Sequence, residues 1–192
     1  MAHDLILASA SPRRADLLRQ IGVRFAVHTA DVPELYSEGE RPEDYVARLS
    51  LAKARAVAPL VSLPVLGADT VVVCDGEVLE KPRDAEHAQA MLLSLAGRRH
   101  QVMTGVALVD QARIQQQVVI TQVLFGPITP AQAAAYWQSG EPADKAGGYA
   151  IQGLGAVFVE RIEGSFSNVV GLPLYETAQL LRAVAVPCGL VG

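Results

Sequence analysis

Two consecutive arginines stand at the expected start of a helix, in the segment Ala8–Arg14 (ASASPRR). An apolar run, residues 4–7, precedes the segment, and a serine followed by proline is typical of the first turn of a helix. A helix N-terminus carries partial positive charge, so Arg13 and Arg14 each oppose the dipole by about a few tenths of a kcal/mol. Because arginine binds phosphate through a bidentate fork, an anion is the expected reason for this placement.

Lys53 and Asp69 form a second pair of candidates. Lys53 follows Val46 and Leu49 at helical spacing, which puts it on the apolar face of the expected helix. An isolated lysine there is more often a side chain that snorkels at the edge of that face. Asp69, in GADTVVV, is expected at the mouth of a central strand, where an ionised carboxylate needs a metal, a cation or strong hydrogen bonds. A bulge or turn at Gly67 and Asp69 is the structural alternative, but a carboxylate at a strand end favours catalysis.

Three further residues are weaker candidates when taken alone. Lys81 precedes Pro82 at a rigid turn, although exposed loop lysines are common. Glu34 lies in an acidic loop that solvation explains equally well. Gln152, in DKAGGYAIQG, is expected on a half-buried strand, where its amide offers a donor and an acceptor to the edge of a base. The paired glycines of this segment indicate either close approach of a ligand or only a turn.

The bulk composition limits the class of protein. The chain has 192 residues, 51% of them hydrophobic, and a net charge of −4, which predicts a single globular domain over residues 1–192. The negative charge argues against general adhesion to nucleic acid or anionic membrane. Cys74 and Cys188 lack the spacing of a metal or redox motif and are expected to be reduced thiols of a cytoplasmic protein. The four histidines show no metal spacing, and no apolar stretch approaches the roughly 18 residues of a membrane span.

Hydrophobic periodicity and turn residues predict alternating strands and helices. The order, with hairpins and crossovers, predicts an α/β fold with a mixed sheet. Neither GxGxxG nor a Walker A motif is present to bind a nucleotide. The expected elements are a strand at 4–7, a helix that begins at Pro12 and includes ADLLRQIG, a strand at 24–29, a helix at 42–60, a hairpin with arms 71–74 and 77–79, a helix at 84–96, strands at 100–109 and 113–125, a helix at 130–139, strands within 149–153 and 156–164, and a closing helix from Leu172-Pro173.

Six segments in this order, together with Glu34 and Lys53, resemble the Maf family of nucleoside triphosphate pyrophosphatases over nearly the whole chain. They are SASPRR, GADTVV, EKPRDAEHA, LSLAGRRHQVMTGVAL, DKAGGYAIQG and NVVGLPL. The resemblance implies an elongated mixed sheet flanked by helices and two lobes with a cleft, similar to the inosine triphosphate pyrophosphatases. It also implies hydrolysis of a nucleoside triphosphate to the monophosphate and pyrophosphate with a divalent cation, Mg²⁺ or Mn²⁺, in the house-cleaning of nucleotide pools.

The resemblance also assigns roles to individual residues. Asp69 matches the family's catalytic acid, described as the proton acceptor, and Asp69 and Glu34 match its metal region. Ser9, Arg13, Arg14, Lys53 and Lys81 match its phosphate region. The residues at the three positions of base preference, Arg13, Thr70 and Gln152, resemble the dTTP/UTP branch. The 7-methyl-GTP branch instead has SPWRR, GSDQV and a glutamate in place of the glutamine. Pro33 departs from the family, whose members often carry an acid there, which weakens the expectation of metal binding by this loop.

The expected mechanism has Asp69 deprotonate a water that attacks the α-phosphorus while the cations neutralise the leaving pyrophosphate. Pyrimidine nucleoside triphosphates, normal or modified, are the expected partners, and the family allows a homodimer. Two alternatives are a regulator of septum formation that binds nucleotide without turnover, and a phosphatase that releases orthophosphate. The presence of Asp69 and of every expected cation disfavours the regulator.

Overall fold

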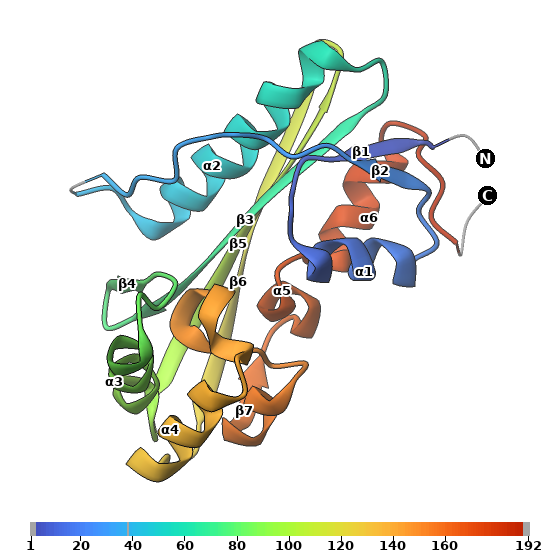
Figure 1. Cartoon of the computed structure of the whole chain (residues 1–192). Helices are drawn as coiled ribbons and strands as arrows, with labels where there is room; N and C mark the ends of the chain where they lie inside the picture. The colour runs from blue at the N-terminus through green and yellow to red at the C-terminus, as the bar shows by residue number, and fades with distance from the viewer. Residues whose placement is uncertain (1–2, 38, 190–192) are drawn as a thin grey trace. The chain divides into compact units, whose positions relative to one another are not determined.

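The computed structural model describes residues 3–37 and 39–189 (Figure 1). Within these residues, seven strands form one mixed sheet in the order β2-β1-β3-β5-β6-β7, with β4 paired to β3. β1 is parallel to β2 and to β3, whereas the pairs β3–β4 and β6–β7 are antiparallel. The strands are β1 (Leu5–Leu7), β2 (Phe25–Val27), β3 (Val65–Cys74), β4 (Glu77–Leu79), β5 (Arg99–Asp110), β6 (Arg113–Phe125) and β7 (Val159–Glu163).

Helices connect and cover these strands, which confirms the predicted α/β class. The α-helices are α1 (Pro12–Gln20), α2 (Pro42–Val57), α3 (Ala85–Leu95), α4 (Pro130–Gln138), α5 (Phe166–Val170) and α6 (Leu174–Arg182). Short 3₁₀ helices are η1 (Ala58–Leu60), η2 (Glu141–Asp144), η3 (Ala146–Gly148) and η4 (Leu154–Phe158). In the described part of the chain, no helix has the length and apolar character needed to cross a bilayer.

The chain folds into two compact units. Unit 1 comprises residues 1–69, 104–119 and 171–192, and unit 2 comprises residues 70–103 and 120–170. Each unit is therefore built from segments that are distant in the sequence, and each has its own buried core.

In unit 1, α2 packs closely on the sheet because two strand residues lack side chains. A Cβ atom at Gly67 of β3 would lie 2.2 Å from the carbonyl oxygen of Ser50, and one at Gly105 of β5 would lie 2.2 Å from that of Val46. Such distances are far inside van der Waals contact, so only glycine fits at these positions. The close approach brings the middle of α2 against β3 (Figure 1).

The core of unit 2 is aromatic. Phe125 makes edge-to-face contacts with His100 and Tyr149, at centroid distances of 4.8 and 4.7 Å. Tyr136 makes a similar contact with Phe158 at 5.3 Å. All five side chains are buried, and such aromatic pairs add stability beyond the area that they bury.

Turn residues and helix-capping residues in the sequence predicted most of the helices and strands correctly. In the β3–β4 hairpin, Asp75 and Gly76 have φ angles of 51° and 84°, as a two-residue type I′ turn requires. Asp84 caps α3 by accepting a hydrogen bond from the backbone N–H of His87 at 2.8 Å. Thr129 and Gln132 form a capping box at α4. The helix predicted at 42–60 is α2 followed by the 3₁₀ turn η1.

The strand predicted within residues 149–153 was wrong. Residues 151–153 form a turn that leads into η4, and β7 begins only at Val159. Tyr149 and Ile151 are buried in the core of unit 2, and the N–H of Ala150 donates to the hydroxyl of Tyr136 at 3.0 Å rather than to a neighbouring strand. Side-chain contacts therefore replace the expected strand pairing. The helix α5 was also missed.

Candidate active site

Lys53 is the centre of a group of charged side chains in unit 1. It projects from the buried face of α2, as the helical spacing predicts, and is only 8% exposed. Its Nζ donates to Oδ1 of Asp69 at 2.6 Å and lies 2.5 Å from Oε1 of Glu34. The alternative of a lysine that snorkels to solvent is therefore wrong, because the ammonium group is held between two carboxylates.

Asp69 is buried within β3 rather than at its end. The predicted strand-end position was wrong, since β3 continues to Cys74. Pairing with β1 nevertheless stops at Leu66, so Asp69 lies on the part of β3 that β1 no longer covers. Asp69 is 7% exposed, and its ion pair with Lys53 offsets part of the cost of burying the charge.

The loop that carries Glu34 is held against α2 by two side chains of that helix. The hydroxyl of Tyr45 donates to the carbonyl of Glu34 at 3.2 Å. Arg48 donates to the carbonyl of Leu35 at 3.0 Å and to both carboxylate oxygens of Glu40 at 2.7 Å. The Glu34 side chain itself is 45% exposed. Solvation of an acidic loop is therefore an incomplete explanation, because the loop is tied down beside Lys53.

Ser9 and Arg14 organise the start of α1. Ser11 occupies the predicted N-cap position, but its side chain makes no capping hydrogen bond. Instead, Oγ of Ser9 accepts from the backbone N–H of Ser11 at 3.2 Å and from Nη1 of Arg14 at 3.1 Å. Nε of Arg14 donates to the carbonyl of Gly171 at 2.8 Å. These bonds fix the guanidinium next to the first turn of the helix.

The charges of this region act on one another. Burial lowers the pKa of Arg14, and the charge of Arg13 lowers it further, whereas the carboxylates of Asp69 and Glu34 raise it. An arginine guanidinium remains protonated at physiological pH in any case. Unit 1 thus brings together five predicted site residues, which are Ser9, Arg14, Glu34, Lys53 and Asp69, with Arg13 on the same turn of α1 as Arg14.

The remaining three predicted residues belong to unit 2. Thr70 follows Asp69 on β3 and is partly buried. Lys81 is exposed in the loop between β4 and α3, as predicted. Gln152 is exposed in the turn before η4, so its predicted place on a half-buried strand was wrong.

Four residues that support the candidate site carried no sequence signal strong enough to single them out. Tyr45 and Arg48 of α2 hold the Glu34 loop. Tyr136 and Glu141 lie on either side of the glycine that ends α4, and they hold the segment that carries Gln152. The hydrogen-bond partners of these four residues are distant in the sequence or use backbone atoms. Such contacts leave no recognisable motif in the sequence.

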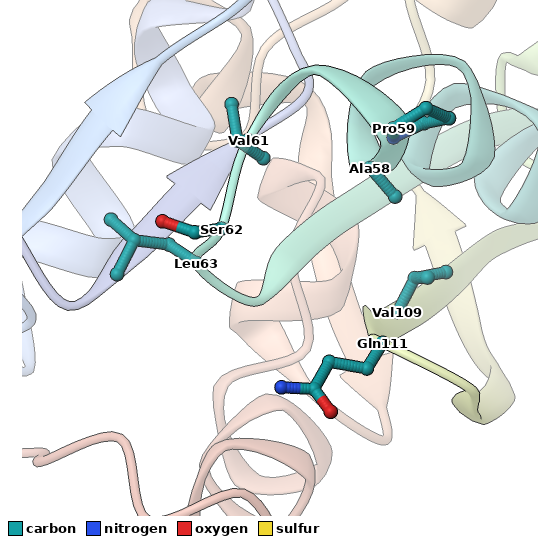
Figure 2. A pocket seen from close by; sticks show the side chains of 7 residues that line it. All are labelled: Ala58, Pro59, Val61, Ser62, Leu63, Val109 and Gln111. Carbon is teal, nitrogen blue, oxygen red and sulfur yellow. The ribbon is translucent and has the colours of Figure 1, made fainter.

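Unit 1 also has an open pocket of about 330 Å³ that is unsuited to a nucleotide (Figure 2). Its lining side chains include no charged group, and Ser62 and Gln111 are the polar ones. A triphosphate needs several cations around its oxygens, so this pocket does not meet the requirement. It is lined by Ala58, Pro59, Val61, Ser62, Leu63, Val109 and Gln111.

Comparison with known proteins identifies the family. The sequence profile of the family described as Maf-like protein matches residues 4–184. The chain belongs to the Maf family. A Maf relative from Saccharophagus degradans, named dTTP/UTP pyrophosphatase, is 56% identical over 189 residues, which cover 96% of this chain and 90% of the relative. A second relative of that name, from Vibrio vulnificus, is also 56% identical and covers 94% of this chain and 98% of its own length.

Among solved structures, a nucleoside-triphosphatase described as a dITP/XTP pyrophosphatase from Mycobacterium abscessus matches this Maf chain with a TM-score of 0.49. The two are 17% identical, and the match covers 94% of each chain.

Proposed function

We propose that the chain is a nucleoside triphosphate pyrophosphatase that hydrolyses dTTP and UTP to the monophosphate and pyrophosphate. The observation that carries this proposal is the cluster in which Lys53 contacts Asp69 and Glu34 beside the arginines of α1. Maf relatives that are 56% identical over nearly their whole length and bear the name dTTP/UTP pyrophosphatase support the same activity.

In this proposal the cations of the site bind the triphosphate. Arg14 is held by Ser9 and by the carbonyl of Gly171, so little side-chain freedom is lost when it binds phosphate. Arg13 and the N-terminus of α1 add positive potential at the same end of the helix. Lys53 supplies a point charge to the remaining phosphate oxygens.

Asp69 is the proposed general base. It accepts a proton from the water that attacks the α-phosphorus. As the new P–O bond forms, the bond from the α-phosphorus to the bridging oxygen breaks, and pyrophosphate leaves with that oxygen. Lys53 holds the Asp69 carboxylate in one orientation through the 2.6 Å hydrogen bond, which keeps the base in place for the reaction.

The carboxylates of Glu34 and Asp69 are the groups that we propose for the divalent ion that the family resemblance implies. Both converge on Nζ of Lys53, and Mg²⁺ and Mn²⁺ favour carboxylate oxygens. The residues that the structure describes contain no group of three or more His, Cys, Asp or Glu side chains suited to a metal. Glu34 and Asp69 would therefore share the ion with phosphate oxygens and water, as is usual for Mg²⁺. When bound, the ion supplies positive charge to the phosphate oxygens.

The experiment that tests the function is analysis of the products from a panel of nucleotides. The purified chain is incubated with Mg²⁺ and with each of the common ribo- and deoxyribonucleoside triphosphates, and pyrophosphate and orthophosphate are measured separately. We expect equimolar monophosphate and pyrophosphate from dTTP and UTP. Release of orthophosphate would indicate a phosphatase, and binding without any product would indicate the nucleotide-binding regulator. Modified pyrimidine triphosphates added to the panel would show whether the natural substrate is a damaged nucleotide.

We also propose a cytoplasmic location, since Cys74 and Cys188 are both free thiols in buried positions. Removal of non-standard or excess pyrimidine triphosphates from the nucleotide pool is the role that fits this location. Light scattering of the purified chain would test whether it forms the homodimer that the family allows.

A further inference from the structure

The segment that carries Gln152 is anchored at both ends by one pair of side chains. The hydroxyl of Tyr136 accepts a hydrogen bond from the N–H of Ala150 at 3.0 Å and donates to Oε1 of Glu141 at 2.6 Å. The Glu141 carboxylate then accepts from the N–H of Leu154 at 2.9 Å and from that of Gly155 at 3.0 Å. Residues 150 and 154–155 are thereby linked through a single phenol–carboxylate pair, with Gln152 between them.

Two glycines of the segment are required by this arrangement. A Cβ atom at Gly153 would lie 2.1 Å from Oε2 of Glu141, and one at Gly155 would lie 2.7 Å from the hydroxyl oxygen of Tyr136. No side chain fits at such distances, so the backbone of the segment approaches the pair as closely as glycine permits.

Tyr136 of this pair is itself fixed in the core of unit 2. Tyr136 is buried and packs edge-to-face on Phe158, and its pKa is raised by burial and by the hydrogen bond to Glu141. Burial also acts to raise the pKa of Glu141, but the hydrogen bonds from Tyr136, Gly155 and Leu154 outweigh it, so that its pKa is lowered. Lys145 lies close by, where its Nζ donates to the backbone carbonyl of Glu141 at 2.6 Å. Glu141 is therefore an ionised carboxylate that accepts hydrogen bonds from several donors. Hydrogen bonds to an ionised group are stronger than those between neutral groups.

Gln152 lies at the tip of the anchored segment and is exposed to solvent. A glutamine amide distinguishes bases only if its donor and acceptor are held in a fixed orientation. In a turn that is not anchored, backbone motion would give the amide several orientations. The amide could then form hydrogen bonds with several different bases equally well.

We propose that Tyr136 and Glu141 are positioning residues that fix the Gln152 turn and thereby set the selectivity for the base of the nucleotide. This inference rests on the proposed function and on the specificity role expected for Gln152. Neither Tyr136 nor Glu141 touches the substrate in this proposal. Both act through the backbone that carries Gln152.

The test compares Tyr136→Phe and Glu141→Gln with the unaltered chain. The first removes only the hydroxyl and keeps the ring, and the second replaces one carboxylate oxygen with a donor that opposes a backbone N–H. The readout is the ratio of kcat/KM for dTTP to that for dCTP, whose base differs at the edge that Gln152 would read. We expect this ratio to fall about tenfold in each variant, mainly through a higher KM for dTTP, because each variant loses hydrogen bonds that hold the turn. Because both rates scale with the folded fraction, the ratio is insensitive to simple loss of stability.

A matched control and a double-variant cycle make the test specific. Glu163→Gln makes the same chemical change in unit 2, where the carboxylate contacts Arg99 and Arg161, and should leave the ratio unchanged. In a Gln152→Ala background, Tyr136→Phe should cause no further loss of selectivity, since the residue through which it acts is gone. A ratio that stays near that of the unaltered chain in both single variants, or losses that add in the double variant, would overturn the inference.

Failure of the proposed function can be distinguished from failure of this inference. If the unaltered chain releases pyrophosphate from no nucleotide in the panel, the proposed activity is wrong. Amide hydrogen exchange then tests the anchoring by itself. The amide of Ala150 should exchange about tenfold faster in Tyr136→Phe, and the amides of Leu154 and Gly155 about tenfold faster in Glu141→Gln, because each variant disturbs the acceptor of those amides. Unchanged exchange at these amides would overturn the positioning role independently of activity.

Discussion

At the scale of single residues, the candidate site depends on one lysine that satisfies two carboxylates. Nζ of Lys53 lies 2.6 Å from Asp69 and 2.5 Å from Glu34, and Lys53 and Asp69 are both buried. A buried charge that loses its partner is strongly destabilising, by about 3–5 kcal/mol, so these residues are coupled in stability as well as in chemistry. A substitution that separates the two effects must remove the charge of Asp69 but keep its hydrogen bond.

Asp69→Asn meets this requirement. The amide oxygen of asparagine can still accept from Lys53, so we expect the fold and nucleotide binding to be retained. Asparagine cannot accept the proton of the attacking water, and turnover should fall by about 10³-fold, a typical contribution of a general base. Pyrophosphate release, calorimetric titration with dTTP and thermal unfolding measure the three quantities. A variant that binds and turns over nucleotide at a near-normal rate would refute the assignment of Asp69.

At the scale of elements, local chemistry predicted those parts of the fold whose shape it controls. The Asp75-Gly76 turn fixes its hairpin, and Asp84 fixes the start of α3, because the deciding contacts lie within a few residues. The segment 149–158 was mispredicted because its backbone bonds to Tyr136 and Glu141 instead of a neighbouring strand. Such contacts are decided by packing in three dimensions, and no periodicity in the sequence records them.

The Glu34 loop offers a prediction at this scale. Arg48→Met keeps the aliphatic stem but removes the guanidinium that holds Leu35 and Glu40, so the loop is released from α2. We expect kcat/KM for dTTP to fall about tenfold, since misplacement of a site residue is costly. Stability should change little, because the Arg48 side chain is 43% exposed and water screens its ion pair with Glu40.

Arg41→Met is the matched control for that experiment. Arg41 stands at the start of α2 and also binds a carboxylate through two hydrogen bonds, at 2.8 and 2.9 Å, but its partner is Asp44 on the helix itself. Its loss leaves the Glu34 loop in place, and kcat/KM should stay close to that of the unaltered chain. Equal effects of the two variants would show that the loop contacts of Arg48 are irrelevant to activity.

The aromatic core of unit 2 predicts a dependence of stability on pH. Burial lowers the pKa of His100 from 6.5 to about 4, so this histidine stays neutral in the folded chain. Between these pH values the unfolded chain takes up a proton that the folded chain does not. The contribution of His100 to the free energy of unfolding is therefore fully present above pH 6.5. It is lost as the pH falls toward 4, and the loss amounts to about 3 kcal/mol.

His100→Gln isolates that contribution. Glutamine does not titrate, and its amide can reach toward the hydroxyl of Tyr149, which lies 2.8 Å from Nε2 of His100. Urea unfolding of both chains from pH 7.5 to pH 4 gives their free energies of unfolding. We expect the unaltered chain to lose about 3 kcal/mol more than the variant over this range. Parallel curves would mean that His100 titrates alike in the folded and unfolded states.

At the scale of the whole molecule, the candidate residues divide between two units that the sequence order does not reveal. The arginines at the start of α1 already indicated an anion, because they oppose the helix dipole, and Asp69 indicated a carboxylate in need of a cation, because its neighbours in the sequence are apolar. Their contacts could not be derived in the same way, since the chain folds Asp69 of β3 onto Lys53 of α2 and Gly171 onto Arg14. Unit 1 holds the carboxylates and most of the cations, whereas unit 2 holds Thr70 and Gln152.

The roles proposed for Arg14 and Gln152 predict that binding of phosphate and selection of the base respond to different substitutions. Arg14→Lys loses the bidentate fork but keeps a positive charge, so kcat/KM should fall by the same factor, about tenfold, for every nucleoside triphosphate. Gln152→Ala should instead lower the preference for dTTP and UTP over dCTP and leave the rate with poor substrates unchanged. In the unaltered chain, the kcat/KM values for dTTP and UTP should lie within about tenfold of each other. The bases differ by one methyl group, whose burial contributes only about 1 kcal/mol to binding. Steady-state kinetics of the three chains with dTTP, UTP, dCTP and dGTP measures all of these ratios. A change of base preference in Arg14→Lys, or a uniform loss in Gln152→Ala, would contradict the roles proposed for these two residues.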